Sequence, residues 1–149
     1  MTGGTSGMGG TSGSGGSKGS PAAPSLELFR EGRPEAVFSS TGSWLHPLFD
    51  LERFLLSSQL DPRECVLRDK LVGKAAALLI VRLGFVRIYT GILSRPGEEV
   101  LTAHSVTYEA VQRVERILCR TEELLAEVDD PEEAYRIICT RIEERRVQS

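Results

Sequence analysis

The chain has 149 residues, of which 40% are hydrophobic, 26% charged and 6% aromatic, and its formal net charge is -3. This length and composition predict a single soluble globular domain, because the chain is too short for two domains of ordinary size. The nearly balanced charge excludes the basic surface that generic nucleic-acid binding requires. The longest apolar stretch, residues 75–81, is far shorter than the roughly 20 residues of a membrane-spanning helix, so no membrane association is expected.

Of the first 20 residues, 17 are Gly, Ser or Thr. Such a segment cannot bury enough apolar surface to offset its backbone entropy, so residues 1–24 are predicted to form a disordered tail and residues 25–146 a single domain. Three widely spaced cysteines in a chain without an apolar signal sequence are poor material for a secreted disulfide framework. The sequence therefore predicts a reducing, cytoplasmic location.

The N-terminal part of the domain predicts a β-hairpin followed by a helix. Residues 26–28 alternate as a half-buried strand does, and residues 37–38 follow beyond the turn signal Glu31-Gly32. Pro47 fits the first turn of a helix, where its missing N–H is harmless, and leucines then recur at helical spacing as far as about Ser57.

The start of the central buried helix is left open between two positions. Asp61-Pro62-Arg63-Glu64 has the acid, proline and glutamate of a helix start, and a helix from there would run to Leu83 and end at Gly84. Asp69 is an equally good cap for a helix that begins after a short turn or strand. Periodicity alone does not separate the two.

The segment from Phe85 to Leu93 is rich in β-branched and aromatic residues and apolar on both alternations, as a central strand is. Ser94-Arg95-Pro96 opens a short helix to about His104, and residues 106–110 alternate as a further strand. A strand, helix, strand unit favours parallel pairing, so the sheet is expected to be mixed.

The C-terminal part is acidic, since residues 98–149 hold 7 basic and 13 acidic side chains. Apolar residues recur at helical spacing from Val114 to Val128, which predicts a helix. A last helix is expected to begin with Asp130 as N-cap and Pro131 in its first turn, and to run to Arg145-Arg146.

Residues 69–79, Asp-Lys-Leu-Val-Gly-Lys-Ala-Ala-Ala-Leu-Leu, resemble a family of small proteins known as domain of unknown function 1893. Other segments agree in order and spacing: Gly42 through Pro47-Leu48, Ser94 followed by Pro96, Tyr108-Glu109, and Cys119-x-x-Glu122 ahead of residues 129–134. That family resembles the cytidine-deaminase fold. The resemblance implies an α/β fold, a three-layer α-β-α sandwich with a mixed central sheet, and it favours a central helix that starts near Asp69.

The chain departs from the family pattern near its end. The usual pattern has a glycine loop containing Asn-Arg and then Cys-Pro-Met-Glu, whereas here the loop is shortened to Arg116-Ile117-Leu118. Arg120 and Thr121 stand where the pattern has proline and methionine. Any ligand contact made by that loop in relatives is therefore not carried over to this chain.

Zinc deaminases need a His or Cys with a Glu two residues on at one helix start, and Pro-Cys-x-x-Cys at the next. Neither motif occurs, because Asp69-Lys70 and Pro96-Gly97-Glu98-Glu99 stand at these places. His46 and His104 are isolated. We expect no metal site and no cofactor.

Lys70 and Lys74 lie four residues apart and are expected on one helical face, beside Gly73 and close to the helix start, where backbone N–H groups favour an anion. They predict a site for a small anionic or nucleotide-like ligand. The further contacts expected from this prediction are Asp69, Gly73, Ser94, Cys119 and Glu122. The alternative is a solvated lysine stripe, with Gly73 serving only tight helix packing.

Two other functions stay open. A metal-independent enzyme could use Lys74, or Cys119 with Glu122 as a base, although no catalytic residue is assigned. A structural or protein-interaction module is the other alternative, and the isoleucines of the last helix could cover a second subunit of a homo-oligomer.

Overall fold

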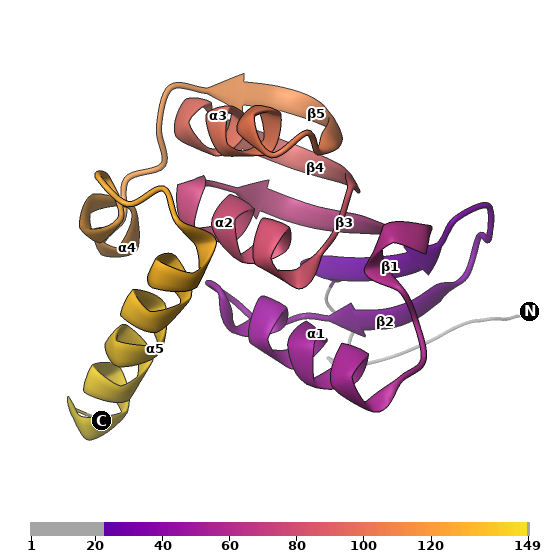
Figure 1. Ribbon diagram of the computed structural model, residues 1–149, viewed down its shortest axis with the longest axis horizontal. Coiled ribbons are helices and arrows are strands. Elements are labelled where there is room, and N and C mark those ends of the chain that lie inside the picture. The colour runs from indigo at the N-terminus through magenta and orange to yellow at the C-terminus, as the bar shows by residue number, and fades with distance from the viewer. Residues whose placement is uncertain (1–22, 149) are drawn as a thin grey trace, which may run out of the picture.

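The computed structural model of the protein describes residues 23–148, so nearly all of the expected tail 1–24 lies outside the described residues. Figure 1 shows the arrangement of the elements, which follow each other along the chain. In order they are β1 (Leu26–Arg30), β2 (Ala36–Ser40), α1 (His46–Ser57), the short 3-10 helix η1 (Pro62–Glu64), β3 (Cys65–Val72), α2 (Lys74–Leu83), β4 (Arg87–Ser94), α3 (Arg95–Ala103), β5 (Thr107–Val114), α4 (Arg120–Leu124) and α5 (Pro131–Gln148).

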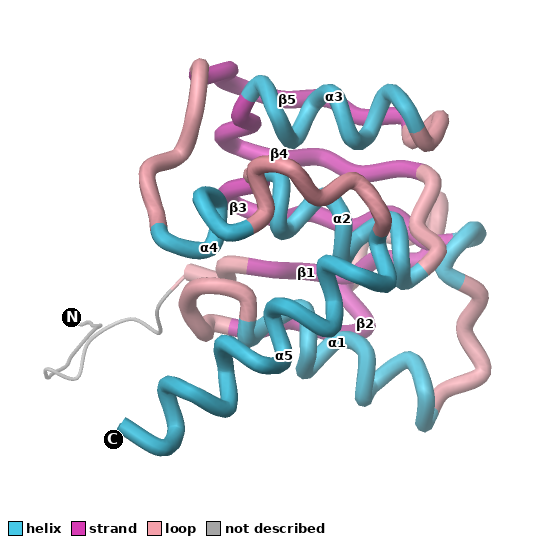
Figure 2. The backbone as a smooth tube through the Cα atoms, turned by 60° about the vertical axis from the view of Figure 1, so that its left-hand side comes forward, coloured by secondary structure: helices cyan, strands magenta, loops and turns pink. Residues whose placement is uncertain are grey.

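The five strands form one mixed sheet in the order β2-β1-β3-β4-β5 (Figures 1 and 2). Strand β1 pairs antiparallel with both β2 and β3, whereas β3, β4 and β5 are parallel to one another. Gly32 adopts a φ of 78° in the turn between β1 and β2, a conformation that favours glycine. The expected hairpin, the mixed sheet and the α/β class are confirmed.

The two faces of the sheet differ sharply in exposure. Leu28, Leu67 and Ile88 are neighbours across β1, β3 and β4, and all three are 0% exposed. The neighbouring residues on these strands belong to the other face of the sheet, because side chains alternate between the faces. They form a second row of half-buried to exposed residues: Glu27, Arg68, Tyr89 and Glu109. We call the face that carries this row, together with Lys70 and Val111, the open face.

Helices α1, α2 and α3 cover the buried face, in front of the strands in Figure 1. Helix α1 connects β2 to β3, α2 connects β3 to β4, and α3 connects β4 to β5, so each connection moves in the same direction across the sheet. Because such connections are right-handed, all three helices lie on the same face. The three-layer sandwich was expected to have helices on both faces. Of the described helices, however, α5 packs against α2 and α1 instead of on the open face.

The central helix begins at Lys74, so the expected start at Asp61 and the preferred start near Asp69 are both wrong. The capping residues at Asp61 are used by the single turn η1, where Asp61 accepts a hydrogen bond from the backbone N–H of Arg63. The next eight residues form β3, because their pairing between β1 and β4 outweighs local helix signals.

The helix expected between Val114 and Val128 is also wrong in extent. Strand β5 continues to Val114 through its parallel pairing with β4, and only the short helix α4 forms in the segment that follows. The last helix is confirmed, with Asp130 accepting a hydrogen bond from the backbone N–H of Glu133 at 3.0 Å. None of the described helices combines the length and the apolar character needed to cross a membrane.

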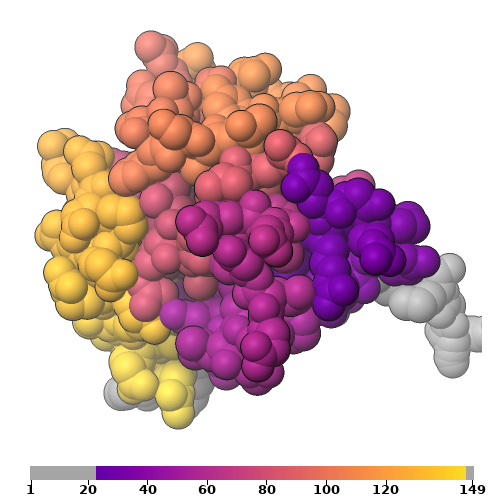
Figure 3. Space-filling view, turned by 45° about the vertical axis from the view of Figure 1, so that its right-hand side comes forward, coloured from indigo at the N-terminus to yellow at the C-terminus, as the bar shows by residue number. Residues whose placement is uncertain are grey.

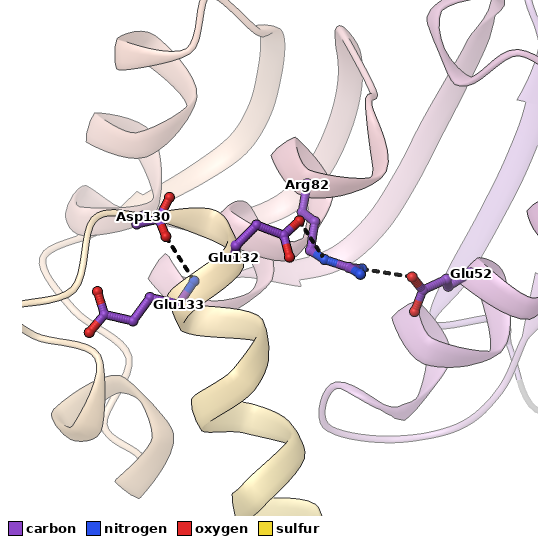
Figure 4. Close-up of polar contacts among 5 residues, drawn as sticks. All are labelled: Glu52, Arg82, Asp130, Glu132 and Glu133. Carbon is purple, nitrogen blue, oxygen red and sulfur yellow. Dashed lines mark hydrogen bonds and ion pairs between the residues drawn. The ribbon is translucent and has the colours of Figure 1, made fainter.

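Helix α5 runs along one side of the molecule, shown in yellow in Figure 3, and its buried residues are Ala134 and Ile138. Arg82 of α2 holds the beginning of α5 in place. The guanidinium of Arg82 pairs with Glu132 of α5 at 3.1 Å and with Glu52 of α1 at 2.7 Å (Figure 4). The same guanidinium lies 3.5 Å from the centre of the Tyr135 ring. Three helices therefore meet at one arginine.

Candidate functional site

A cavity of about 860 Å³ lies between α3, the loop 115–119 and α4. Lys74, the first residue of α2, also lines it. In Figure 2, α4 and the loops on either side of it lie close to the start of α2. The remaining lining residues are Arg95, Pro96, Glu99, Val100, Ala103, His104, Glu115, Arg116, Ile117, Leu118, Cys119, Glu122, Glu123, Ala126 and Asp129.

Two glycines bring the first turns of α2 and α3 together at this cavity. A β-carbon on Gly97 would lie 3.0 Å from the carbonyl carbon and oxygen of Gly73, so the backbone of Gly73 would have to shift slightly to admit a side chain. Ser94 is fully buried and caps α3, because its hydroxyl accepts a hydrogen bond from the backbone N–H of Gly97 at 3.1 Å. Ser94 therefore positions the start of α3 and does not line the cavity.

The carboxylate of Glu122 occupies the N-terminus of α2. One oxygen accepts a hydrogen bond from the backbone N–H of Lys74 and the other from that of Ala75, both at 2.8 Å. Backbone N–H groups at a helix start are a ready-made anion site, and here the anion belongs to the chain itself. The expected anion position at this helix start is thus filled by one of the residues expected to contact the ligand.

Lys74 is only 8% exposed and its charge is matched within the chain. Its Nζ donates a hydrogen bond to the carbonyl oxygen of Ala126 at 3.0 Å and lies 3.1 Å from a carboxylate oxygen of Asp129. The ammonium group therefore holds the segment between α4 and α5 against α2. Sequence reasoning missed Asp129 as a partner, because its acidic run was interpreted only as a helix cap.

Helix α4 has a further anchor in Trp44, the single tryptophan of the chain. The indole N–H of Trp44 donates to the hydroxyl of Thr121 at 3.2 Å, and the guanidinium of Arg145 lies 4.5 Å from the centre of the indole ring system. Trp44 has a positive φ of 58°, which is uncommon for a residue with a side chain. No local sequence signal links Trp44 to α4, since the two are 77 residues apart.

Asp69 and Lys70 lie outside this site. Both are in β3 and line a separate hollow of about 270 Å³, together with Tyr89 and Thr90. Burial raises the pKa of the Asp69 carboxyl to about 7, although the backbone N–H groups of Leu71 and Lys70 act to lower it. The expectation that Lys70 and Lys74 share one helical face is wrong, because only Lys74 belongs to the helix.

The structure therefore brings Gly73, Lys74, Cys119 and Glu122 together and separates Asp69 and Lys70 from them. Cys119 is an exposed free thiol on the cavity wall. Among the described residues no group of three or more His, Cys, Asp or Glu side chains is arranged to hold a metal ion.

The cavity wall combines apolar side chains with a net negative charge. Its charged residues are three basic ones, Lys74, Arg95 and Arg116, and five acidic ones, Glu99, Glu115, Glu122, Glu123 and Asp129. Arg95 already lies 3.8 Å from Glu99 and 3.6 Å from Glu115. Such a wall favours a ligand with an apolar body and neutral or positively charged polar groups over an anion.

Comparison with known proteins identifies the family. A family model described as domain of unknown function (DUF1893) matches residues 35–142. The fold is similar to the crystal structure of a DUF1893 family protein from Thermotoga maritima, with 26% sequence identity and a TM-score of 0.69 over 79% of this chain and 80% of that chain. No curated protein matches the sequence. The chain belongs to the DUF1893 family.

Proposed function

We propose that the domain binds a small, uncharged or positively charged molecule in the cavity between α3 and α4. The ligand class that fits is a flat heterocycle with amino groups, as in a nucleobase or nucleoside. One observation carries this proposal: Glu122 already neutralises the first turn of α2, while the rest of the wall combines apolar side chains with four acidic and three basic ones. Val100 and Ile117 would contact the ring faces, and rim carboxylates would accept hydrogen bonds from the amino groups.

This proposal replaces the small anion expected from the sequence and keeps the nucleotide-like ligand only through its base. A small anion would have to displace Glu122 from two backbone hydrogen bonds, and it would find Lys74 already paired with Asp129. A nucleotide-like ligand remains compatible through its base, provided that its phosphate stays outside the helix start. A binding role without an assigned reaction is therefore the function that the geometry supports best.

The relation to the cytidine-deaminase fold is part of the same proposal. It is supported by the close approach of the starts of α2 and α3 at Gly73 and Gly97, since zinc deaminases carry their ligands at two helix starts. The residues at these positions do not fit a zinc ion, because they offer neither imidazole nor thiolate. A cytoplasmic location is likewise proposed and is supported by three cysteines that are all free thiols.

The test is a thermal-shift comparison of adenosine and cytidine with their 5′-monophosphates, followed by calorimetry on any probe that binds. Selective binding to the folded state raises its apparent stability, so a nucleoside is expected to raise the Tm more than its monophosphate does. Ala103→Phe would fill the cavity from its exposed rim and abolish the shift. Ala36→Phe, at an exposed position on β2, is the matched control and should leave the shift intact.

The proposal fails if neither nucleoside shifts the Tm, or if the shift survives Ala103→Phe. A larger shift with the monophosphates than with the nucleosides would also overturn it, because the ligand would then be the anion that the cavity wall disfavours.

A further inference from the structure

The open face of the sheet lacks the cover that parallel strands normally have. Sheets of parallel strands occur almost only where both faces are covered, because their strands are buried on both sides. Here β3, β4 and β5 are parallel, yet Tyr89 on β4, the middle one of these three, is 39% exposed and Val111 on β5 is 90% exposed. The described part of the chain places no helix over these residues.

The charges on the open face are of both signs and lie in order across the sheet. The row runs from Glu27 through Arg68 and Tyr89 to Glu109, and Lys70 lies one row further along β3. Arg68 lies 3.4 Å from Glu27, so part of this charge is already paired. A phosphate backbone or an anionic membrane would call for an excess of basic residues, which this row does not have.

A surface with an arginine beside an aromatic ring at its centre, here Arg68 and Tyr89, can complement a copy of itself. In an isologous contact the same patch faces itself across a two-fold axis. With the axis along the strands between β3 and β4, Arg68 of one copy would face Tyr89 of the other, a favourable cation–π arrangement. The same axis places Glu27 of one copy opposite Glu109 of the other. These two carboxylates lie at the margins of the contact, where water and salt screen their repulsion.

We propose that a second copy of this chain covers the open face, so that two sheets pack face to face with the helices outside. Strands β3, β4 and β5 have eight residues each. With β1 beside them, and about 3.3 Å per residue and about 4.8 Å between strands, they offer a flat area of roughly 500 Å². Protruding side chains enlarge this toward the roughly 800 Å² per partner of a standard stable interface.

The experiment is sedimentation velocity on the full chain at concentrations from about 1 to about 100 μM, with circular dichroism to check the fold. The wild type is expected to sediment at twice the mass of one chain. Tyr89→Glu places a charge at the centre of the proposed contact and is expected to raise the dimer Kd at least about tenfold. Val111→Glu, at a position that is 90% exposed, should act in the same direction without disturbing the fold.

The matched control is Leu56→Glu, which changes an 80% exposed leucine on α1 and should leave the dimer intact. A monomeric wild type at the highest concentration would overturn the proposal, as would a dimer that resists both variants. If Val111→Glu separates the subunits and Tyr89→Glu does not, the copies pair along the edge strand β5 and face-to-face packing is ruled out.

Discussion

Gly73 and Glu122 are in such close contact that a β-carbon on Gly73 would lie 2.8 Å from the nearest carboxylate oxygen of Glu122. The glycine is thus what allows the carboxylate to reach the first N–H groups of α2. The contact ties the short helix α4 to the central helix over a separation of 48 residues. Loss of this contact should therefore lower the free energy of unfolding and change the environment of Trp44.

Gly73→Ala is expected to lower the free energy of unfolding by about 1–3 kcal/mol, because Glu122 must withdraw from two charge-assisted hydrogen bonds. Urea denaturation measures the loss, and the fluorescence of Trp44 reports whether α4 moves with it. When Glu122 is already replaced by alanine, Gly73→Ala should lower the free energy of unfolding much less, since the new β-carbon at residue 73 no longer meets a carboxylate. Additive effects of the two substitutions would contradict this coupling.

Lys74→Met keeps the buried stem of the side chain and removes its ammonium group. The hydrogen bond to the carbonyl oxygen of Ala126 and the ion pair with Asp129 are then lost, at a cost of about 1 kcal/mol. Hydrogen exchange should accelerate in the segment 125–130 in particular. Lys70→Met, at an exposed position on β3, is the control and should leave exchange in that segment unchanged.

The buried carboxyl of Asp69 predicts a pH dependence of stability. Its pKa in the folded chain is raised to about 7 from an ordinary value of 3.8, so the folded state holds a proton that the unfolded state releases between these values. The stability that Asp69 contributes is therefore full below about pH 4 and is lost as the pH rises toward about 7.

Chemical denaturation at about pH 5 and about pH 8 measures this effect. The wild type should lose more stability between the two pH values than Asp69→Asn does, by on the order of 1 kcal/mol or more. An equal loss in both proteins would show that the carboxyl titrates alike in the folded and unfolded chains.

The elements that the sequence predicts well are those whose signals are local. The hairpin, α1, β4, α3 and α5 all begin within a few residues of their turn or capping signals, because glycine, proline and Asx residues act on their immediate neighbours. Strand β3 was foreseen only as a short turn or strand ahead of a helix start at Asp69, for the converse reason. Its partners Leu28 and Ile88 are distant in sequence, whereas the helix-start pattern at Asp61 is adjacent.

This error carried over directly to the site. Four residues span about 6 Å along a helix but about 13 Å along a strand, so an expected lysine pair became two unrelated side chains. Gly73 was correctly identified as a position of close approach, yet the groups that approach it are Glu122 and Gly97 of the chain itself. Sequence spacing picked out Gly73, Lys74 and Glu122, which the structure brings into contact, but it did not show that Glu122 itself accepts the hydrogen bonds at the helix start.

Arg82 offers the clearest test of how α5 is held. Its side chain is only 19% exposed and contacts Glu52, Glu132 and the ring of Tyr135, so it serves three partners from two other helices. Pairing with Glu52 and Glu132 also raises the pKa of Arg82 despite its partial burial, so the group stays charged. Arg82→Ala should therefore leave two carboxylates without their cation and loosen α5, at a cost of about 2 kcal/mol.

Limited proteolysis and hydrogen exchange of α5 would detect that loosening, and urea denaturation would measure its cost. Arg82→Lys is expected to recover little of the loss, because an ammonium group cannot bind both carboxylates and stack on Tyr135 in the same way. Arg63→Ala removes an exposed ion pair with Asp61 and should cost much less stability than Arg82→Ala does. If the two alanine variants are equally stable, α5 is held by its apolar face alone, through Ala134 and Ile138.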